Sequence, residues 1–254
     1  MCTILFSFKN HPIYDFIFIG NRDEFKNRPS ARARFWKTNP DVLSGIDLKK
    51  GGTWTGITKG GRIAFVTNYR AYPFKKNSSL SRGFLTSEFL TSTIPPKKYL
   101  RIIRSKSHMY NPFNLIVGTP EELWYYSNVE NKIKGISPGI YGISNSLLDT
   151  PWYKVQKAKE SFLSLINTTF SINDLFSILD DREIPADEFL PKTGVPLETE
   201  RLLSSIHINS PDYGTVYKTI ILIDKSGVVY FYEKHLNQKD NWILNSYKFH
   251  LKKE

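Results

Sequence analysis

Hydrophobic residues in the first 70 positions form short runs separated by polar and glycine-containing segments. Runs of this length between turn residues predict β-strands. The predicted strands span residues 2–8, 16–20, 53–58 and 63–67. The last two flank Lys59-Gly60-Gly61, where glycine supplies the positive φ that a tight turn needs. Residues 27–50 are polar, arginine-rich and contain two prolines, so they are predicted to form a long ordered loop.

The middle of the chain has apolar positions at helical spacing, and the end returns to strand-like runs. The predicted helices span residues 82–90, 97–104, 151–167 and 171–179. The last begins with Ser171 as the cap and Asp174 completing a capping box. The further predicted strands span residues 114–117, 123–126, 140–144, 216–223, 228–232 and 242–249. Residues 180–196 are acidic and contain proline, which indicates a surface loop.

The predicted elements come in the order strands, helices, strands. This order predicts one α+β domain over residues 1–254, in which the first and last strands share a sheet. No apolar run approaches the roughly 20 residues that cross a bilayer, so no transmembrane segment is expected. The N-terminal sequence also lacks the basic and small-residue regions of a signal peptide.

The net charge of +11 is concentrated in the first part of the chain. Residues 1–110 contain 20 Lys/Arg and 6 Asp/Glu, whereas residues 111–254 contain 15 and 18. A basic region of this kind suits nucleic acid, an anionic membrane surface or a small carboxylate or phosphate. The simplest interpretation is a solvated basic face. No helix-turn-helix, zinc-finger or RNP-like pattern is present, which disfavours nucleic acid as a partner.

The chain has one cysteine, at position 2, which excludes an internal disulfide and favours a reducing compartment. If Met1 is removed, the α-amine lies beside the thiol and can accept its proton, as in an N-terminal nucleophile. The surrounding positive charge is expected to favour the thiolate. A small apolar residue opening a buried strand explains Cys2 equally well. The five histidines lack metal-ligand spacing, so no metal site is predicted.

Several polar motifs follow one another in a specific order along nearly the whole chain. They are Met1-Cys2-Thr3, Asn21-Arg22-Asp23-Glu24, Gly51-Gly52-Thr53-Trp54 with Gly56, Thr67-Asn68, Ser144-Asn145 with Leu148-Asp149-Thr150-Pro151-Trp152, and Pro211-Asp212-Tyr213-Gly214-Thr215. Together they resemble the NRDE family, which includes the animal transport-and-Golgi-organisation proteins. The resemblance implies an αββα four-layer sandwich of the N-terminal nucleophile hydrolase type.

The resemblance also implies a catalytic site. Cys2 matches the nucleophile of the related cysteine acylases, Asp23 an orienting aspartate, and Asn68 and Asn145 two asparagines that stabilise the reacting carbonyl. One departure is that the acylases have an arginine three residues before the aspartate, where this chain has Gly20.

A second departure is at Val216, where the family commonly has arginine. The adjacent Arg22 and Asp23 also face opposite ways on a strand, so both can point at Cys2 only if the strand ends or bulges.

Three functions are compatible with these observations. The resemblance favours binding of a hydrophobic anionic small molecule such as haem or an acyl-CoA, with roles in haem trafficking, lipid homeostasis and Golgi organisation. Haem would then be cargo, and no cofactor is required. The alternatives are an N-terminal cysteine amidohydrolase acting on an N-acyl amide, and an inactive scaffold with the same fold. The expected location is cytoplasmic, with mitochondrial or Golgi association and peripheral membrane contact compatible with the resemblance.

The residues expected to bind such a ligand are basic or aromatic and flank the motifs. Arginine bonds carboxylate and phosphate with a planar fork, and aromatic rings pack against an apolar body. The predicted ligand-binding residues are Arg22, Arg32, Arg34, Arg70, Trp54 and Tyr69.

Overall fold

The structure is a computed structural model that describes residues 2–70, 80–237 and 239–252. Within these residues the strands form two antiparallel sheets. The first sheet contains, in spatial order, β10 (Gly139–Ile143), β1 (Ile4–Phe8), β2 (Tyr14–Phe25), β11 (Tyr213–Asp224), β12 (Val228–Leu236) and β13 (Trp242–His250). The second contains β3 (Ser30–Phe35), β4 (Val42–Asp47), β5 (Thr55–Thr58), β6 (Ile63–Asn68), β7 (Phe113–Gly118), β8 (Leu123–Ser127) and β9 (Lys132–Ile136).

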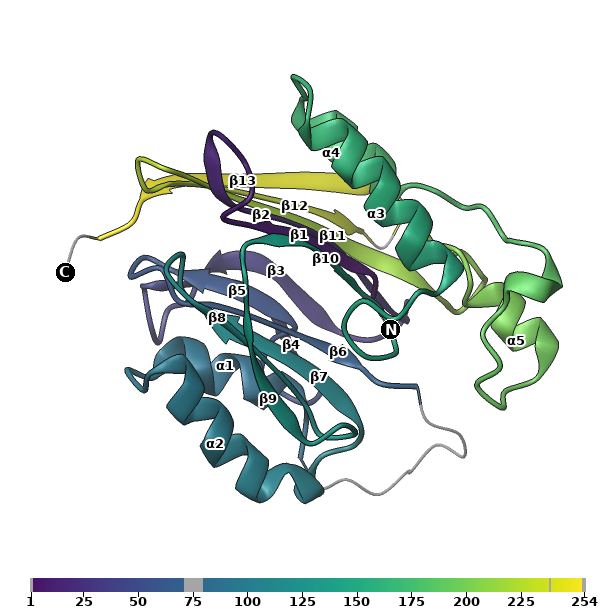
Figure 1. Cartoon of the computed structure of the whole chain (residues 1–254), viewed down its shortest axis with the longest axis horizontal. Coiled ribbons are helices and arrows are strands. Elements are labelled where there is room, and N and C mark those ends of the chain that lie inside the picture. The colour runs from purple at the N-terminus through teal and green to yellow at the C-terminus, as the bar shows by residue number, and fades with distance from the viewer. Residues whose placement is uncertain (1, 71–79, 238, 253–254) are drawn as a thin grey trace.

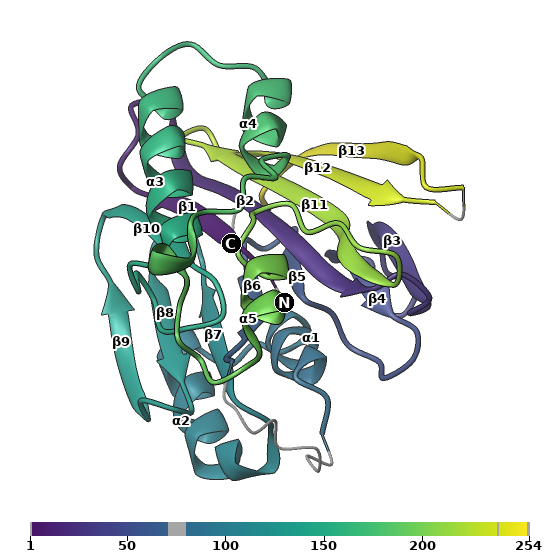
Figure 2. The same ribbon diagram turned by 90° about the vertical axis from the view of Figure 1, so that its right-hand side faces the viewer.

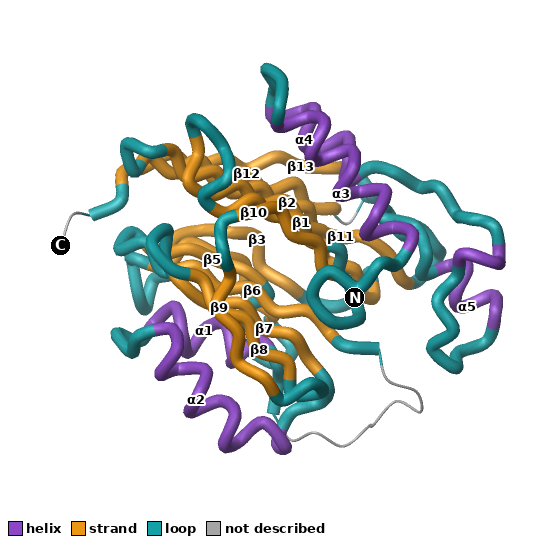
Figure 3. Tube along the Cα trace, in the orientation of Figure 1, coloured by secondary structure: helices purple, strands orange, loops and turns teal. Residues whose placement is uncertain are grey.

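Helices cover the outer face of each sheet (Figures 1 and 3). The helices are α1 (Gly83–Thr91), α2 (Pro96–Lys106), α3 (Tyr153–Ile166), α4 (Ile172–Leu179) and α5 (Leu197–Leu202), with 3-10 turns at Ser107–Met109 and Asp187–Phe189. Helices α1 and α2 pack on the second sheet, and α3 and α4 pack on the first, as the view turned by 90° also shows (Figure 2). The described residues therefore form the expected αββα sandwich, with the first and last strands in one sheet.

Strand β2 explains how the layers are held together. Its even-numbered residues, such as Phe16 and Phe18, join the apolar core between the two sheets. Its odd-numbered residues, such as Ile17 and Ile19, pack against α3 and α4. Because side chains alternate along a strand, a strand buried on both faces reads as a continuous apolar run. No helix in the described ranges is long and apolar enough to cross a membrane.

The prediction of a loop over residues 27–50 is wrong, because β3 and β4 lie within it. On β3 the exposed Arg32 and Arg34 flank Ala33, which is fully buried. An edge strand keeps its charged side chains in solvent while its small residue packs inward, so it lacks the apolar run of a central strand.

The other predicted strands and helices are present, with ends shifted by a few residues. The capping box of α4 is confirmed: Asp174 N–H donates to the Ser171 hydroxyl, and the Asp174 carboxylate accepts from Ser171 N–H. Strand β9 and helix α5 were not predicted, since both are short and polar.

Candidate functional site

A cleft with a volume of about 290 Å³ lies at the carboxyl end of β2, between the loop before β5 and the start of α1. Its walls are mostly charged or polar. The lining residues are Cys2, Arg22, Asp23, Glu24, Arg28, Asp47, Lys50, Thr53, Trp54, Val66, Asn68, Leu80, Ser81, Arg82, Gly83 and Asn111. The structure thus brings together five of the residues singled out from the sequence: Cys2, Asp23, Asn68, Arg22 and Trp54.

Arg22 and Asp23 point to opposite faces of β2. The guanidinium carbon of Arg22 lies 4.4 Å from the centre of the Trp54 ring, on the side between the sheets. Asp23 Oδ1 accepts a hydrogen bond of 2.6 Å from the Thr215 hydroxyl on the other face. Strand β2 neither ends nor bulges here; the register shift lies in β11, around Val216. Both residues nevertheless line the cleft.

Asp23 is almost fully buried, and the hydroxyl of Tyr213 donates to its backbone carbonyl at 3.1 Å. Burial raises the pKa of the Asp23 carboxyl, while the nearby Lys154 acts to lower it.

Lys154 on α3 is itself buried, and its ammonium donates to the carbonyl of Leu203 at 2.8 Å. Burial lowers the pKa of Lys154 to about 8. Sequence reasoning missed this lysine, although it lies two residues after the Asp149–Trp152 motif.

Cys2 is 9% exposed, and its carbonyl accepts a hydrogen bond from Ser144. Burial raises the pKa of the Cys2 thiol, and the Asp23 carboxylate acts in the same direction, against the opposing effect of Arg22. Nearby positive charge thus acts toward the thiolate, as expected, but removal from water outweighs it and raises the pKa of the thiol. The expected removal of Met1 lies outside the described residues.

The two asparagines differ in what their amide groups can reach. Asn68 ends β6 and lines the cleft. Asn145 is fully buried behind it, where its side-chain amide donates to the Asn68 carbonyl at 2.9 Å and its own carbonyl accepts from Arg70 N–H at 2.7 Å. Of the two, Asn68 is the one positioned to contact a molecule in the cleft.

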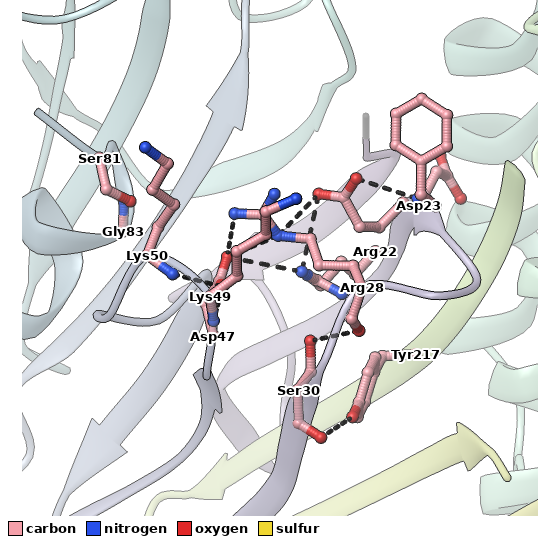
Figure 4. Close-up of polar contacts among 12 residues, drawn as sticks. Arg22, Asp23, Arg28, Ser30, Asp47, Lys49, Lys50, Ser81, Gly83 and Tyr217 are labelled. Carbon is pink, nitrogen blue, oxygen red and sulfur yellow. Dashed lines mark hydrogen bonds and ion pairs between the residues drawn. The ribbon is translucent and has the colours of Figure 1, made fainter. Parts of the chain in front are cut away.

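Most charges in the cleft are balanced by a neighbour, as Figure 4 shows. Arg28 donates to one oxygen of Asp47 through Nε and Nη2, at 2.9 and 2.8 Å. Arg22 lies 3.7 Å from Glu24 and 3.8 Å from Asp47. Although burial acts to raise it, the pKa of Asp47 is lowered, because Arg28 and the backbone N–H of Lys50 donate to the carboxylate.

Arg82 and Lys50 are the exceptions. Among the described residues, no carboxylate lies within 4.0 Å of either side chain. Arg82 donates to the carbonyl of Pro112 at 2.9 Å and immediately precedes α1. Burial lowers the pKa of Arg82 to about 10, which leaves it charged at neutral pH. The cleft therefore contains cations available to an anion.

The other arginines and the tyrosine predicted to bind a ligand do not line the cleft. Arg32 and Arg34 are exposed on β3, and Arg32 donates to Asn245 at 3.4 Å. Arg70 is buried and paired with Glu200 at 2.5 Å. The Tyr69 N–H donates to Pro112 at 3.1 Å.

The fold defines the class of protein. The described residues form an αββα sandwich of the N-terminal nucleophile hydrolase type, and Cys2, Asp23 and Asn68 line one cleft in it. Within the described ranges, no group of His, Cys, Asp and Glu is arranged to hold a metal ion.

The chain belongs to the family described as Transport and Golgi organisation 2, which matches residues 1–238. It is 35% identical to the human Transport and Golgi organization protein 2 homolog, with 99% of each chain covered. It is 34% identical to the Mus musculus Transport and Golgi organization 2 homolog, again with 99% of each covered. Among solved structures it is similar to the C2A mutant of conjugated bile acid hydrolase from Clostridium perfringens, at 12% identity and a TM-score of 0.39, covering 98% of this chain and 97% of that one.

Proposed function

We propose that the cleft binds the anionic end of a hydrophobic small molecule, such as haem or a long-chain acyl-CoA, and that the protein thereby serves haem trafficking or lipid homeostasis. The observation that carries the proposal is the pair of cations, Arg82 and Lys50, that face the cleft without a carboxylate partner among the described residues. A half-buried cation without a counter-charge is costly, so an anion that pairs with Arg82 offsets part of that cost.

The cleft's size and apolar residues indicate which part of the ligand it holds. Its volume of about 290 Å³ is at the lower end of the range for ligand sites. It suits a carboxylate or phosphate group better than a whole porphyrin or acyl chain. Trp54, Val66 and Leu80 supply apolar contacts at its wall. The apolar body of the ligand would extend from these residues toward the opening.

The raised pKa of the Cys2 thiol favours binding over hydrolysis as the function of the cleft. The thiolate is the nucleophile in cysteine catalysis, and burial raises the pKa of Cys2. The observations that favour an amidohydrolase are the hydrogen bond from Asp23 N–H to the Cys2 sulfur and the position of Asn68 in the cleft. In that second candidate function, the Cys2 thiolate attacks the carbonyl carbon of an N-acyl amide, Asp23 orients Cys2, and the Asn68 amide stabilises the oxyanion. The amine leaves with the proton of the thiol, and water then hydrolyses the thioester to release the acid. Asn145 supports Asn68 through its hydrogen bond to the Asn68 carbonyl.

Titration of haem and of a long-chain acyl-CoA into the protein tests the binding proposal. Lys50→Gln and Lys49→Gln form a matched pair, because both lysines are exposed and both donate a backbone N–H to Asp47, but only Lys50 lines the cleft. Loss of one charge-assisted bond should weaken binding about 10-fold to 100-fold for Lys50→Gln, with no change for Lys49→Gln. Arg82→Gln should weaken it at least as much.

Two results would refute the proposal: affinity no tighter than tens of micromolar for both ligands, or equal effects of the two lysine variants. Cys2→Ala separates the two functions. The binding proposal expects it to retain affinity, whereas hydrolysis of an N-acyl amino acid, if present, should be abolished.

A further inference from the structure

Helix α2 forms the outermost surface of the α1–α2 layer, away from the sheets (Figure 1). Its apolar residues Tyr99, Leu100 and Ile103 are buried in the core between this layer and the second sheet. The opposite side of the helix is strongly basic. The α2 face consists of the exposed helix residues Lys97, Lys98, Arg101, Ile102 and Arg104, together with Met109 in the 3-10 turn that follows.

The positive charge of this face is not neutralised locally. Between Glu88 and Glu121 the chain contains no Asp or Glu. At the end of α2, Lys106 Nζ lies 3.6 Å from Glu88 Oε2 and forms an ion pair with it. No carboxylate of the described residues lies within 4.0 Å of Lys98, Arg101 or Arg104. The face therefore presents a row of cations to solvent.

Two exposed apolar side chains accompany these cations. Ile102 lies on α2 and Met109 in the 3-10 turn that follows it, and each is 39% exposed. The aromatic rings of the segment are instead turned inward, since Tyr99 and Tyr110 are buried. Proteins that bind single-stranded nucleic acid stack bases on exposed aromatic rings, which this face does not offer. Cations interspersed with exposed aliphatic residues on an outer helix match the anionic headgroups and shallow apolar region of a lipid surface.

We propose that the α2 face docks the protein on an anionic membrane surface. The helix stays packed on its sheet, and its cations contact headgroup phosphates and carboxylates while Ile102 and Met109 enter the headgroup region. This docking is independent of ligand binding in the cleft. It keeps the protein at a membrane through electrostatic attraction that salt weakens.

Co-sedimentation with vesicles tests the proposal. The vesicles contain phosphatidylcholine alone or phosphatidylcholine with phosphatidylserine. The wild type should bind the second kind more tightly, and added salt should release it. Each Lys or Arg near an anionic surface contributes about a fivefold factor in affinity. Replacing Lys98, Arg101 and Arg104 by glutamine should therefore weaken binding on the order of 100-fold.

A second triple variant provides a control with the same net charge. Lys37, Lys192 and Lys225 are exposed lysines outside the α1–α2 layer, and replacing all three by glutamine removes three charges elsewhere. This variant should keep nearly wild-type vesicle binding. Equal losses in both triple variants would show that overall charge, rather than the α2 face, drives attachment. The proposal would be overturned if phosphatidylserine did not raise the affinity for vesicles, or if the protein bound RNA or DNA oligomers more tightly than the vesicles.

Discussion

The buried ion pair between Arg70 and Glu200 links segments far apart in sequence, and removing it should destabilise the fold. The two side chains are 1% and 5% exposed, with Arg70 Nη1 and Glu200 Oε2 2.5 Å apart. The other oxygen of Glu200 accepts from the backbone N–H of Thr193 at 2.9 Å and from its hydroxyl. The guanidinium carbon of Arg70 lies 5.0 Å from the centre of the Trp152 ring. One carboxylate thus connects α5 and its preceding loop to the end of β6.

Glu200→Ala leaves Arg70 buried without its carboxylate and Thr193 without its acceptor. Breaking a buried pair in this way should cost about 3–5 kcal/mol in free energy of unfolding. In a chain of this size that corresponds to a fall of roughly 10 °C in Tm. The double variant Arg70→Met with Glu200→Leu should recover much of the loss, because apolar residues remove the uncompensated charge.

Urea unfolding followed by tryptophan fluorescence and circular dichroism measures these differences. Glu198→Ala is the matched control, because Glu198 lies on the same helix and is paired with Arg201, but its side chain is 82% exposed. Its loss should cost less than about 1 kcal/mol. If Glu200→Ala costs no more than Glu198→Ala, the reasoning about the buried pair is wrong.

Three further predictions concern Glu233, Gly52 and Cys2. Burial raises the pKa of the Glu233 carboxyl to about 8. Its contribution to stability is therefore complete below pH 4.5, the pKa of the unfolded chain, and is lost as pH rises through about 8. Glu233→Gln should remove this dependence of stability on pH. Urea midpoints at about pH 5 and about pH 8.5 check it, and an unchanged pH slope in the variant would contradict it. Gly52→Ala should cost more than about 2 kcal/mol, because φ is +76° and a Cβ would lie 2.3 Å from the Gly83 backbone; unaltered unfolding in urea would disprove the contact. The Cys2 thiol should react with iodoacetamide at neutral pH more slowly than a free cysteine peptide, and equal rates by mass spectrometry would show that it is not buried.

The fold could be predicted where hydrophobic pattern and local structure agree. The capping box before α4 and the glycine turn before β6 are local signals, and both are present. Strand β3 escaped prediction because edge strands are stabilised by pairing with a neighbour distant from the local sequence. Its Arg32 and Arg34 resemble loop residues until β4 is placed beside them.

The candidate site was partly predictable for a related reason. The motifs identify Cys2, Asp23 and Asn68, which line the cleft. They do not identify Arg82 or Lys50, because the availability of a cation depends on which carboxylates the fold brings near it. Arg28 has Asp47, whereas neither Arg82 nor Lys50 has a carboxylate within 4.0 Å in the described part of the chain. Sequence supplies the charged groups, and tertiary structure decides their pairing.

The register shift at Val216 lets one strand serve two separate environments. Thr215 pairs with Asp23 and Tyr217 pairs with Arg22, although residues two apart on a regular strand face the same side. The extra residue places Thr215 with Asp23 on the helix side and Tyr217 with Arg22 between the sheets. A chain lacking one residue here would have to give up one of these two partnerships. The length of this segment is therefore constrained more tightly than the identity of its side chain at position 216, and deletions should be tolerated less than substitutions.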